Sequence, residues 1–136
     1  KEKYYNPMNT IVITTTLPLW RAAQETGAYT QSTVDSTLEE VGFIHATFPD
    51  QTMAMIKRKQ INIPGLMLLL VDTTKLTSPR KIEQSLSGSG VAYPHIYGPI
   101  NLDAVSEIIP IAQDNDGNYI EPPQLSAARL QHAGDH

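Results

Sequence analysis

The continuous apolar run Leu66–Val71, closed by Asp72, constrains the fold more than any other stretch of this chain. Pro64 and Gly65 precede the run, which is too short for a typical helix. A short apolar run bounded by turn residues predicts a strand that is buried on both faces. We therefore expect Leu66–Asp72 to form the middle strand of a sheet.

Further segments rich in β-branched or alternating residues predict the remaining strands. Pro94 interrupts one of them, which predicts an edge position or a bulge because proline donates no ladder hydrogen bond. Asp114–Asn118 contains an Asp-Gly pair and predicts a turn into a short hairpin arm. The predicted strands are Thr10–Thr16, Gly42–Thr47, Lys81–Gln84, Val91–Tyr97 and Glu107–Ala112.

Two segments predict short helices. Leu17–Thr26 has Pro18 in its first turn and Gly27 after its end, which are the positions these residues favour. The second helix is expected from the stretch Thr47–Asp50, which has the pattern of a capping box, to about Gln60. The pattern predicts an α+β fold: two small antiparallel or mixed sheets with two short helices.

A length of 136 residues predicts one domain. We expect residues 1–8 to be an extension or tag and residues 9–120 to form the single α+β domain. Residues 121–136 hold two prolines followed by small and polar residues, and we expect them to be a flexible C-terminal tail. The polar stretch Gln31–Ser36 predicts a loop, and the alternating serine and glycine of Ser85–Gly90 predict a mobile one.

Composition excludes several classes of function. The chain has no cysteine, which excludes disulfide scaffolds, thiolate metal sites and thiol nucleophiles and fits a reducing compartment. A formal net charge of −4 argues against nucleic-acid binding, which needs a basic surface. The apolar runs are too short for a membrane span, and no secretory signal is visible. We expect a cytoplasmic protein that binds a small molecule, with no nucleic-acid or membrane partner.

Two of the four histidines lie within predicted strands and are the first candidates for chemistry. Strand alternation places His45 on the face opposite Ile44, which we assign to the core. Phe43 and Thr47 share the face of His45. His45 therefore either faces a cleft or is a structural histidine satisfied by a hydroxyl such as that of Thr47.

His95 and Tyr97 alternate with Ile96 in the same way, so their rings form one surface on which a planar ligand can stack. The alternative is a structural turn with Tyr97 packed on the core. Glu83 precedes the mobile loop. Its carboxylate is either solvated or acts as a general base or an acceptor for a ribose hydroxyl.

The basic stretch Lys57–Lys59 ends the second predicted helix. It either steers a phosphate-bearing ligand or complements the helix macrodipole. His45, His95 and Glu83 are of ligand type for a metal ion, but no short-range spacing supports such a site. We therefore predict no metal.

Several segments taken together carry a family resemblance: Ile11–Trp20, Gly42–His45, Leu66–Asp72, and Tyr93–Pro99 followed by Leu102–Val105. They resemble, in the same order, a family of small bacterial proteins known as domain of unknown function 952. The match covers roughly Asn9–Tyr119. The strings Gly-Phe-Ile-His and Pro-His-Ile-Tyr-Gly-Pro are fairly specific in combination.

The resemblance implies an α+β fold similar to that of ADP-ribosyltransferases, which bind NAD in a cleft between two small sheets. No cofactor is certain, and NAD is the candidate substrate. The expected catalytic residues are His45, Glu83 and His95, and the expected ligand-binding residues are Thr14, Thr47 and Tyr97.

The reaction that this resemblance implies breaks the bond between nicotinamide and ribose through a cation-like transition state. Glu83 would orient the ribose and stabilise the charge, while Tyr97 would stack on the nicotinamide ring. His45 and His95 would position hydroxyl groups or move a proton.

Ile13 departs from the family pattern, because a histidine commonly occupies its place on the first strand. An apolar side chain cannot hold a ribose hydroxyl. The departure favours the alternative function, a non-catalytic module that binds a ligand in the same cleft. A structural or interaction protein would have no such pocket.

Overall fold

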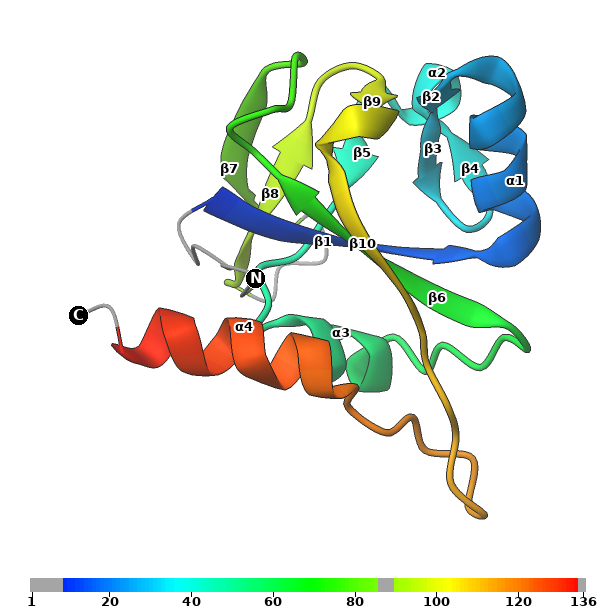
Figure 1. The fold of residues 1–136 in the computed structure, drawn as a ribbon, viewed down its shortest axis with the longest axis vertical. Helices are drawn as coiled ribbons and strands as arrows, with labels where there is room; N and C mark the ends of the chain where they lie inside the picture. Colours follow the sequence, from blue (N-terminus) through cyan, green and yellow to red (C-terminus); the bar gives the residue numbers. More distant parts are fainter. Residues whose placement is uncertain (1–8, 86–89, 135–136) are drawn as a thin grey trace.

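The computed structural model describes residues 9–85 and 90–134 (Figure 1). The prediction for residues 1–8, and that for residues 86–89 of the expected mobile loop, lie outside the described residues. The elements in chain order are β1 (Thr10–Thr16), α1 (Leu17–Thr26), β2 (Ala28–Tyr29), β3 (Gln31–Thr33), β4 (Ser36–Thr37), α2 (Leu38–Val41), β5 (Ile44–His45), α3 (Thr52–Arg58), β6 (Leu66–Asp72), β7 (Arg80–Gln84), β8 (Ala92–Ile96), β9 (Ile100–Asn101), the 3₁₀ helix η2 (Leu102–Ala104), β10 (Val105–Pro110) and α4 (Pro123–Gly134).

Strand β6 is the middle strand of the main sheet. It lies between β1 and β10, and both neighbours run antiparallel to it. Leu69 pairs with Ile13 on one side and with Ile108 on the other. The side chains of Leu68 and Leu69 are fully buried, which confirms the prediction made from the apolar run.

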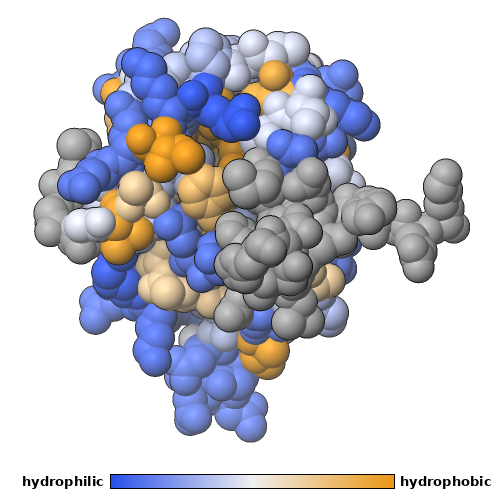
Figure 2. All heavy atoms as spheres, turned by 90° about the vertical axis from the view of Figure 1, so that its left-hand side faces the viewer, coloured by the Kyte–Doolittle hydropathy of each residue, from blue (hydrophilic) through white to orange (hydrophobic). Residues whose placement is uncertain are grey.

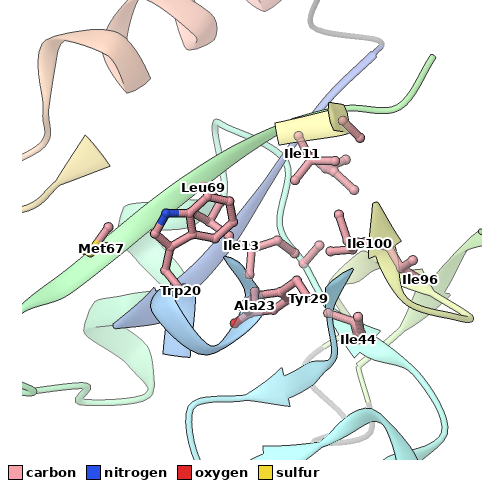
Figure 3. Packing of buried hydrophobic residues seen from close by; sticks show 13 residues of the cluster. Ile11, Ile13, Trp20, Ala23, Tyr29, Ile44, Met67, Leu69, Ile96 and Ile100 are labelled. Atoms are coloured by element: carbon pink, nitrogen blue, oxygen red, sulfur yellow. The ribbon is translucent and has the colours of Figure 1, made fainter. Parts of the chain in front are cut away.

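Side chains of β1 and β6 alternate between the two faces of the main sheet, which divides the core into two layers. On one face, Trp20 and Ala23 of α1 pack against Ile13 and Leu69 (Figure 3). The small sheets complete this layer with Tyr29, Ile44, Ile96 and Ile100.

The opposite face of the main sheet is covered by the two helices α3 and α4 (Figure 1). Ile56 from α3 and Leu125 from α4 pack in one cluster with Val12 and Leu68 of the sheet. A sheet with apolar residues on both faces is stable only when both are covered, so the two layers explain why β6 is continuously apolar.

Helix α4 corrects the prediction of a flexible tail for residues 121–136. The segment from Pro123 to Gly134 is helical, and the side chains of Leu125 and Ala128 are fully buried. The prolines that favoured a tail stand at the start of the helix, where a missing N–H costs no intrahelical hydrogen bond.

Helix α1 spans the predicted residues. Oγ1 of Thr16 accepts a hydrogen bond from the backbone N–H of Leu19, and Pro18 lies in the first turn. Gly27 ends the helix at φ 91°, a left-handed conformation, and its N–H donates to the carbonyl of Ala23.

The capping box expected at Thr47 is not formed. The backbone N–H and C=O of Thr47 exchange hydrogen bonds with Val12 at 2.9 and 2.8 Å, which extends the edge of the main sheet. Helix α3 begins only at Thr52, whose Oγ1 lies 2.8 Å from that of Thr47. Long-range pairing with β1 therefore replaces the local cap.

The stretch expected to be a polar loop is the hairpin of β3 and β4. Gln31 pairs with Thr37, and Ser32 is buried at its centre. The capping box of this region belongs to α2, where Thr37 and Glu40 each accept from the other's backbone N–H.

Strands β5, β8 and β7 form a second antiparallel sheet with β8 in the middle, so the predicted edge position for Pro94 is wrong. The alternative, a bulge, is not formed either, because the register on both sides of β8 is continuous. Pro94 faces the point where β5 has ended, and its carbonyl accepts from the N–H of Ala46 at 3.2 Å. The reciprocal hydrogen bond, from Pro94 to the carbonyl of Ala46, cannot form because proline has no N–H to donate.

The described residues form an α+β fold, as predicted, from small antiparallel sheets. They contain two three-stranded sheets, two two-stranded sheets and four α-helices, more than the two sheets and two helices expected. Within this part of the chain, no helix has the length and apolar character needed to cross a membrane.

Candidate functional site

One face of the β5–β8–β7 sheet gathers four of the six residues expected in the site. His45 lies directly opposite His95 across the β5–β8 pair, and the centroids of their rings are 5.5 Å apart. Side chains alternate between the two faces of a sheet, and Glu83 of β7 and Tyr97, which follows β8, fall on the same face as His95. Residues far apart in sequence are thus brought together by strand register.

Glu83 is the hydrogen-bond acceptor that joins the two rings of β8. Its Oε1 lies 2.9 Å from Nδ1 of His95 and also accepts from the hydroxyl of Tyr97. These hydrogen bonds, with that from Tyr97 the larger effect, lower the pKa of Glu83. The hydrogen bond that Tyr97 donates to Glu83 raises the pKa of Tyr97. His95 therefore donates through Nδ1, which leaves Nε2 unprotonated in its neutral ring.

Phe43 is a residue of this face to which the sequence assigned no role. Its ring stacks on that of His95 at a centroid distance of 4.1 Å and an interplanar angle of 23°. It also touches the ring of His45, with centroids 4.8 Å apart. On the neighbouring strand, Nζ of Lys81 lies 5.1 Å from the ring centroid of Tyr97. Side chains of the protein itself therefore occupy ring faces that were expected to receive a ligand.

The hydrogen bonds of Ser32 determine which nitrogen of His45 carries the proton. The hydroxyl of Ser32 donates to the carbonyl of Phe43 at 2.5 Å. Since a hydroxyl has one proton, Ser32 must accept from Nδ1 of His45, which lies 3.0 Å away. The neutral imidazole then has its lone pair on Nε2. Ser32, rather than the expected Thr47, satisfies His45.

The environment of His45 favours this neutral form. Burial lowers the pKa of His45, and the charges of Lys59 and His95 lower it further. A hydrogen bond to the backbone of Ser32 opposes these effects without reversing them. At neutral pH the Nε2 of His45 is therefore a hydrogen-bond acceptor and a base.

A pocket with a cavity volume of about 100 Å³, partly open to solvent, lies beside His45. This volume is below the roughly 300–1,000 Å³ typical of sites that enclose a drug-sized ligand, so the pocket itself holds a small group or one part of a larger ligand. It is bounded by the edge strand β1, the β3–β4 hairpin, the strand β5 and the end of α3. The lining residues are Val12, Thr14, Ser32, Thr33, Val34, His45, Ala46, Thr47, Met55, Lys59, Ile61 and Tyr93.

The pocket divides the six expected residues into two groups. Thr14, His45 and Thr47 line it, whereas the cluster of Glu83, His95 and Tyr97 does not. His45 connects the two groups, because it lines the pocket and its ring approaches that of His95.

Two threonines of the pocket differ in their hydrogen bonding. Oγ1 of Thr47 lies 2.8 Å from Oγ1 of Thr52. Oγ1 of Thr14 is buried and has no hydrogen-bond partner among the described residues. A buried hydroxyl without a partner is unfavourable, so Thr14 is the hydroxyl here that gains most from a ligand.

Ile13 has no contact with the pocket. Its side chain is buried on the opposite face of β1, in the layer of α1. Its apolar character is therefore explained by core packing, and Thr14 is the neighbouring residue that reaches the pocket.

Several lining residues were not expected from sequence. Ser32 and Thr33 lie in the hairpin that was predicted to be a loop, and Lys59 had been weighed only as part of a basic helix end. The described residues contain no group of three or more histidine, cysteine, aspartate or glutamate side chains that could hold a metal ion.

Comparison of the sequence with models of known protein families gives a match over most of the chain. The model of the family described as "Protein of unknown function (DUF952)" matches residues 14–108, which include the face of His95 and all the lining residues of the pocket except Val12. The chain belongs to this DUF952 family. A search of curated proteins finds no match.

The DUF952 chain is similar to solved structures of protein CC0527 from Caulobacter crescentus. The crystal structure of CC0527 has a TM-score of 0.72 and 27% sequence identity, and the match covers 86% of this chain and 98% of that one. The solution NMR structure of CC0527 gives a TM-score of 0.65 at 28% identity, over 87% and 94% of the two chains.

Proposed function

We propose that the pocket binds NAD or a nucleotide-like small molecule, and that His45 and His95 act on it. The observation that carries this proposal is the position of His45. It lines the pocket, and its ring lies 5.5 Å from that of His95. A base with a fixed tautomer at the wall of a small-molecule pocket is the arrangement expected for proton transfer.

The chemistry follows from the resemblance to ADP-ribosyltransferases, whose fold we propose this chain shares. The bond between C1′ of the ribose and nicotinamide breaks, and its electron pair leaves with nicotinamide. Water or an acceptor hydroxyl forms the new bond at C1′ and gives its proton to Nε2 of His45. Glu83 acts through His95, because it holds that ring by Nδ1 without lining the pocket.

The alternative is a module that binds the same ligand without converting it. The observation in its favour is the stacking of Phe43 on His95, together with Lys81 over the ring of Tyr97. These contacts limit the aromatic surface open to a nicotinamide ring. In this alternative Thr14 and His45 provide hydrogen bonds, and no bond of the ligand is broken.

The test combines ligand binding with product analysis. Thermal shift and calorimetry with NAD, ADP-ribose and nicotinamide measure binding, and mass spectrometry of the incubated NAD detects conversion. The variant His45→Asn keeps a donor for Ser32 and removes Nε2, and Glu39→Gln on the exposed helix α2 is the control.

Conversion of NAD that is lost in His45→Asn and kept in Glu39→Gln would support the enzyme. Binding of NAD or ADP-ribose without conversion would support the module. If none of the three compounds binds at millimolar concentration, both nucleotide proposals are wrong.

A further inference from the structure

Lys59 is the one lysine among the described residues that line the pocket, and no carboxylate stands beside it in the lining. Among the described residues that line it, the titratable side chains are His45, Lys59 and Tyr93, and none is an aspartate or glutamate. The whole chain has a net charge of −4, so this lining is not a general property of the surface. A concave site whose one charged side chain is a lysine attracts anions.

Lys59 is placed to supply that charge. It caps the C-terminal end of α3, and its side chain reaches the pocket wall. Among the described residues, no carboxylate forms an ion pair with it. Lys59 and His45 both line the pocket, and the positive charge of Lys59 lowers the pKa of His45.

The remainder of the lining is amphipathic. Val12, Met55 and Ile61 form an apolar wall. Thr14, Ser32, Thr33 and Thr47 add hydroxyl groups to the lining, and the buried Oγ1 of Thr14 lacks a partner among the described residues. A ligand that fits all of these surfaces has an anionic group, an apolar body and at least one hydrogen-bonding group.

We propose that the pocket selects small amphipathic anions, in which a phosphate or carboxylate group lies against Lys59 and an apolar body lies against Val12, Met55 and Ile61. This inference rests on the proposed function only in treating the pocket as a ligand site. It names the part of the ligand that is recognised, and it holds for a nucleotide and for a smaller organic anion alike.

The experiment compares charged probes with neutral ones that carry the same aromatic ring. Phenyl phosphate and benzoate are the anions, and phenol and benzamide are their neutral counterparts. Calorimetry at low and high salt measures affinity for the full chain. Lys59→Met removes the charge and keeps the apolar stem, while Lys57→Met removes a charge from the same helix end outside the pocket lining.

We expect one of the anions to bind more tightly than its neutral counterpart. Its affinity should fall at least about tenfold in Lys59→Met, since hydrogen bonds to charged groups contribute about 1.5–3 kcal/mol. Lys57→Met should leave the affinity within about twofold, because exposed charges at a distance are screened.

Binding of the anion also predicts a change at His45. An anion beside Lys59 offsets the positive charge that lowers the pKa of this histidine. NMR titration of the imidazole should therefore show a higher pKa for His45 with phenyl phosphate than without it. The other titratable groups near the ring, His95 and Tyr93, come from β8 and are unchanged in these variants.

The outcomes separate this inference from the proposed function. Tight binding of phenyl phosphate or benzoate that depends on Lys59, with no binding of NAD or ADP-ribose, supports the inference and rejects the nucleotide. Equal binding of NAD by the wild type and Lys59→Met overturns the inference and leaves the nucleotide proposal standing. Failure of both anions to bind more tightly than their neutral counterparts also overturns it.

Discussion

Nδ1 of His95 lies 2.9 Å from Oε1 of Glu83, although the two residues are not directly opposite in the sheet. His95 pairs with Lys81, and Glu83 pairs with Tyr93, so the contact is a diagonal one across β7 and β8. The carboxylate thus fixes the orientation and the tautomer of an almost fully buried imidazole.

Replacing this carboxylate with an amide should be detected at Tyr97. The hydrogen bond to Glu83 raises the pKa of Tyr97, so in Glu83→Gln the tyrosine should ionise at a lower pH, closer to its ordinary value of 10.0. Ultraviolet titration of tyrosinate, with Tyr97→Phe to assign the signal, measures this change. Glu39→Gln is the matched control, and an unaltered Tyr97 titration in Glu83→Gln would contradict the hydrogen bond.

His45 should make the fold less stable in mild acid. Its pKa in the folded protein is below the ordinary value of 6.5, so the unfolded chain binds the proton more readily. The contribution of His45 is therefore complete above about pH 6.5 and is lost as the pH falls towards the folded pKa. Melting temperatures between pH 5 and 8 should show this decrease in the wild type.

The same measurement on His45→Asn provides the contrast, because this variant cannot be protonated and its decrease above pH 5 should be smaller. The carboxylates with lowered pKa, Glu40 and Glu83, lose their contributions only below their ordinary value of 4.5. An identical profile for the variant and the wild type would count against a buried, neutral His45.

Tyr29 and Thr15 should show strong coupling in stability. The buried hydroxyl of Tyr29 donates to Oγ1 of Thr15 at 2.8 Å, and burial raises the pKa of Tyr29 to about 12. Tyr29→Phe leaves the threonine oxygen without its donor and should lower the free energy of unfolding by about 1–3 kcal/mol. Urea denaturation of Tyr29→Phe, Thr15→Val and the double variant gives the coupling. Strict additivity of the two changes would argue against this hydrogen bond.

Helix α4 should contribute to global stability. Leu125 is fully buried against the main sheet, so Leu125→Ala should lower the free energy of unfolding by about 2–5 kcal/mol. Ala127→Ser, on the exposed side of the same helix, should change it by less than about 0.5 kcal/mol. A Leu125→Ala protein as stable as the wild type would restore the prediction of a flexible tail.

The sequence was sufficient to predict an element where neighbouring residues alone determine it. The apolar run of β6 and the proline and glycine of α1 each depend on a few neighbouring residues, and both elements lie where predicted. The alternation that separates His45 from Ile44 was also sufficient to put the histidine outside the core.

Prediction failed where a distant segment decides the structure. Thr47 has the pattern of a helix cap, but Val12 takes its backbone hydrogen bonds. Residues 123–134 have little apolar periodicity, and their helix depends on a sheet face that leaves room for Leu125. Lys59 belongs to the pocket only because the end of α3 lies beside β5 and the β3–β4 hairpin, which no local pattern reports.

The Val12–Thr47 bridge has a consequence for self-association. Strand β1 is the last strand on its side of the main sheet. On its outer edge, the pairing seen among the described residues is the single bridge between Val12 and Thr47. Thr14, two residues further on, directs its backbone groups to that same edge. Free strand edges are templates for aggregation. Residues of the β3–β4 hairpin line the same pocket as Thr14, so we expect a variant with a shortened hairpin to expose more of this edge and to form intermolecular sheets more readily.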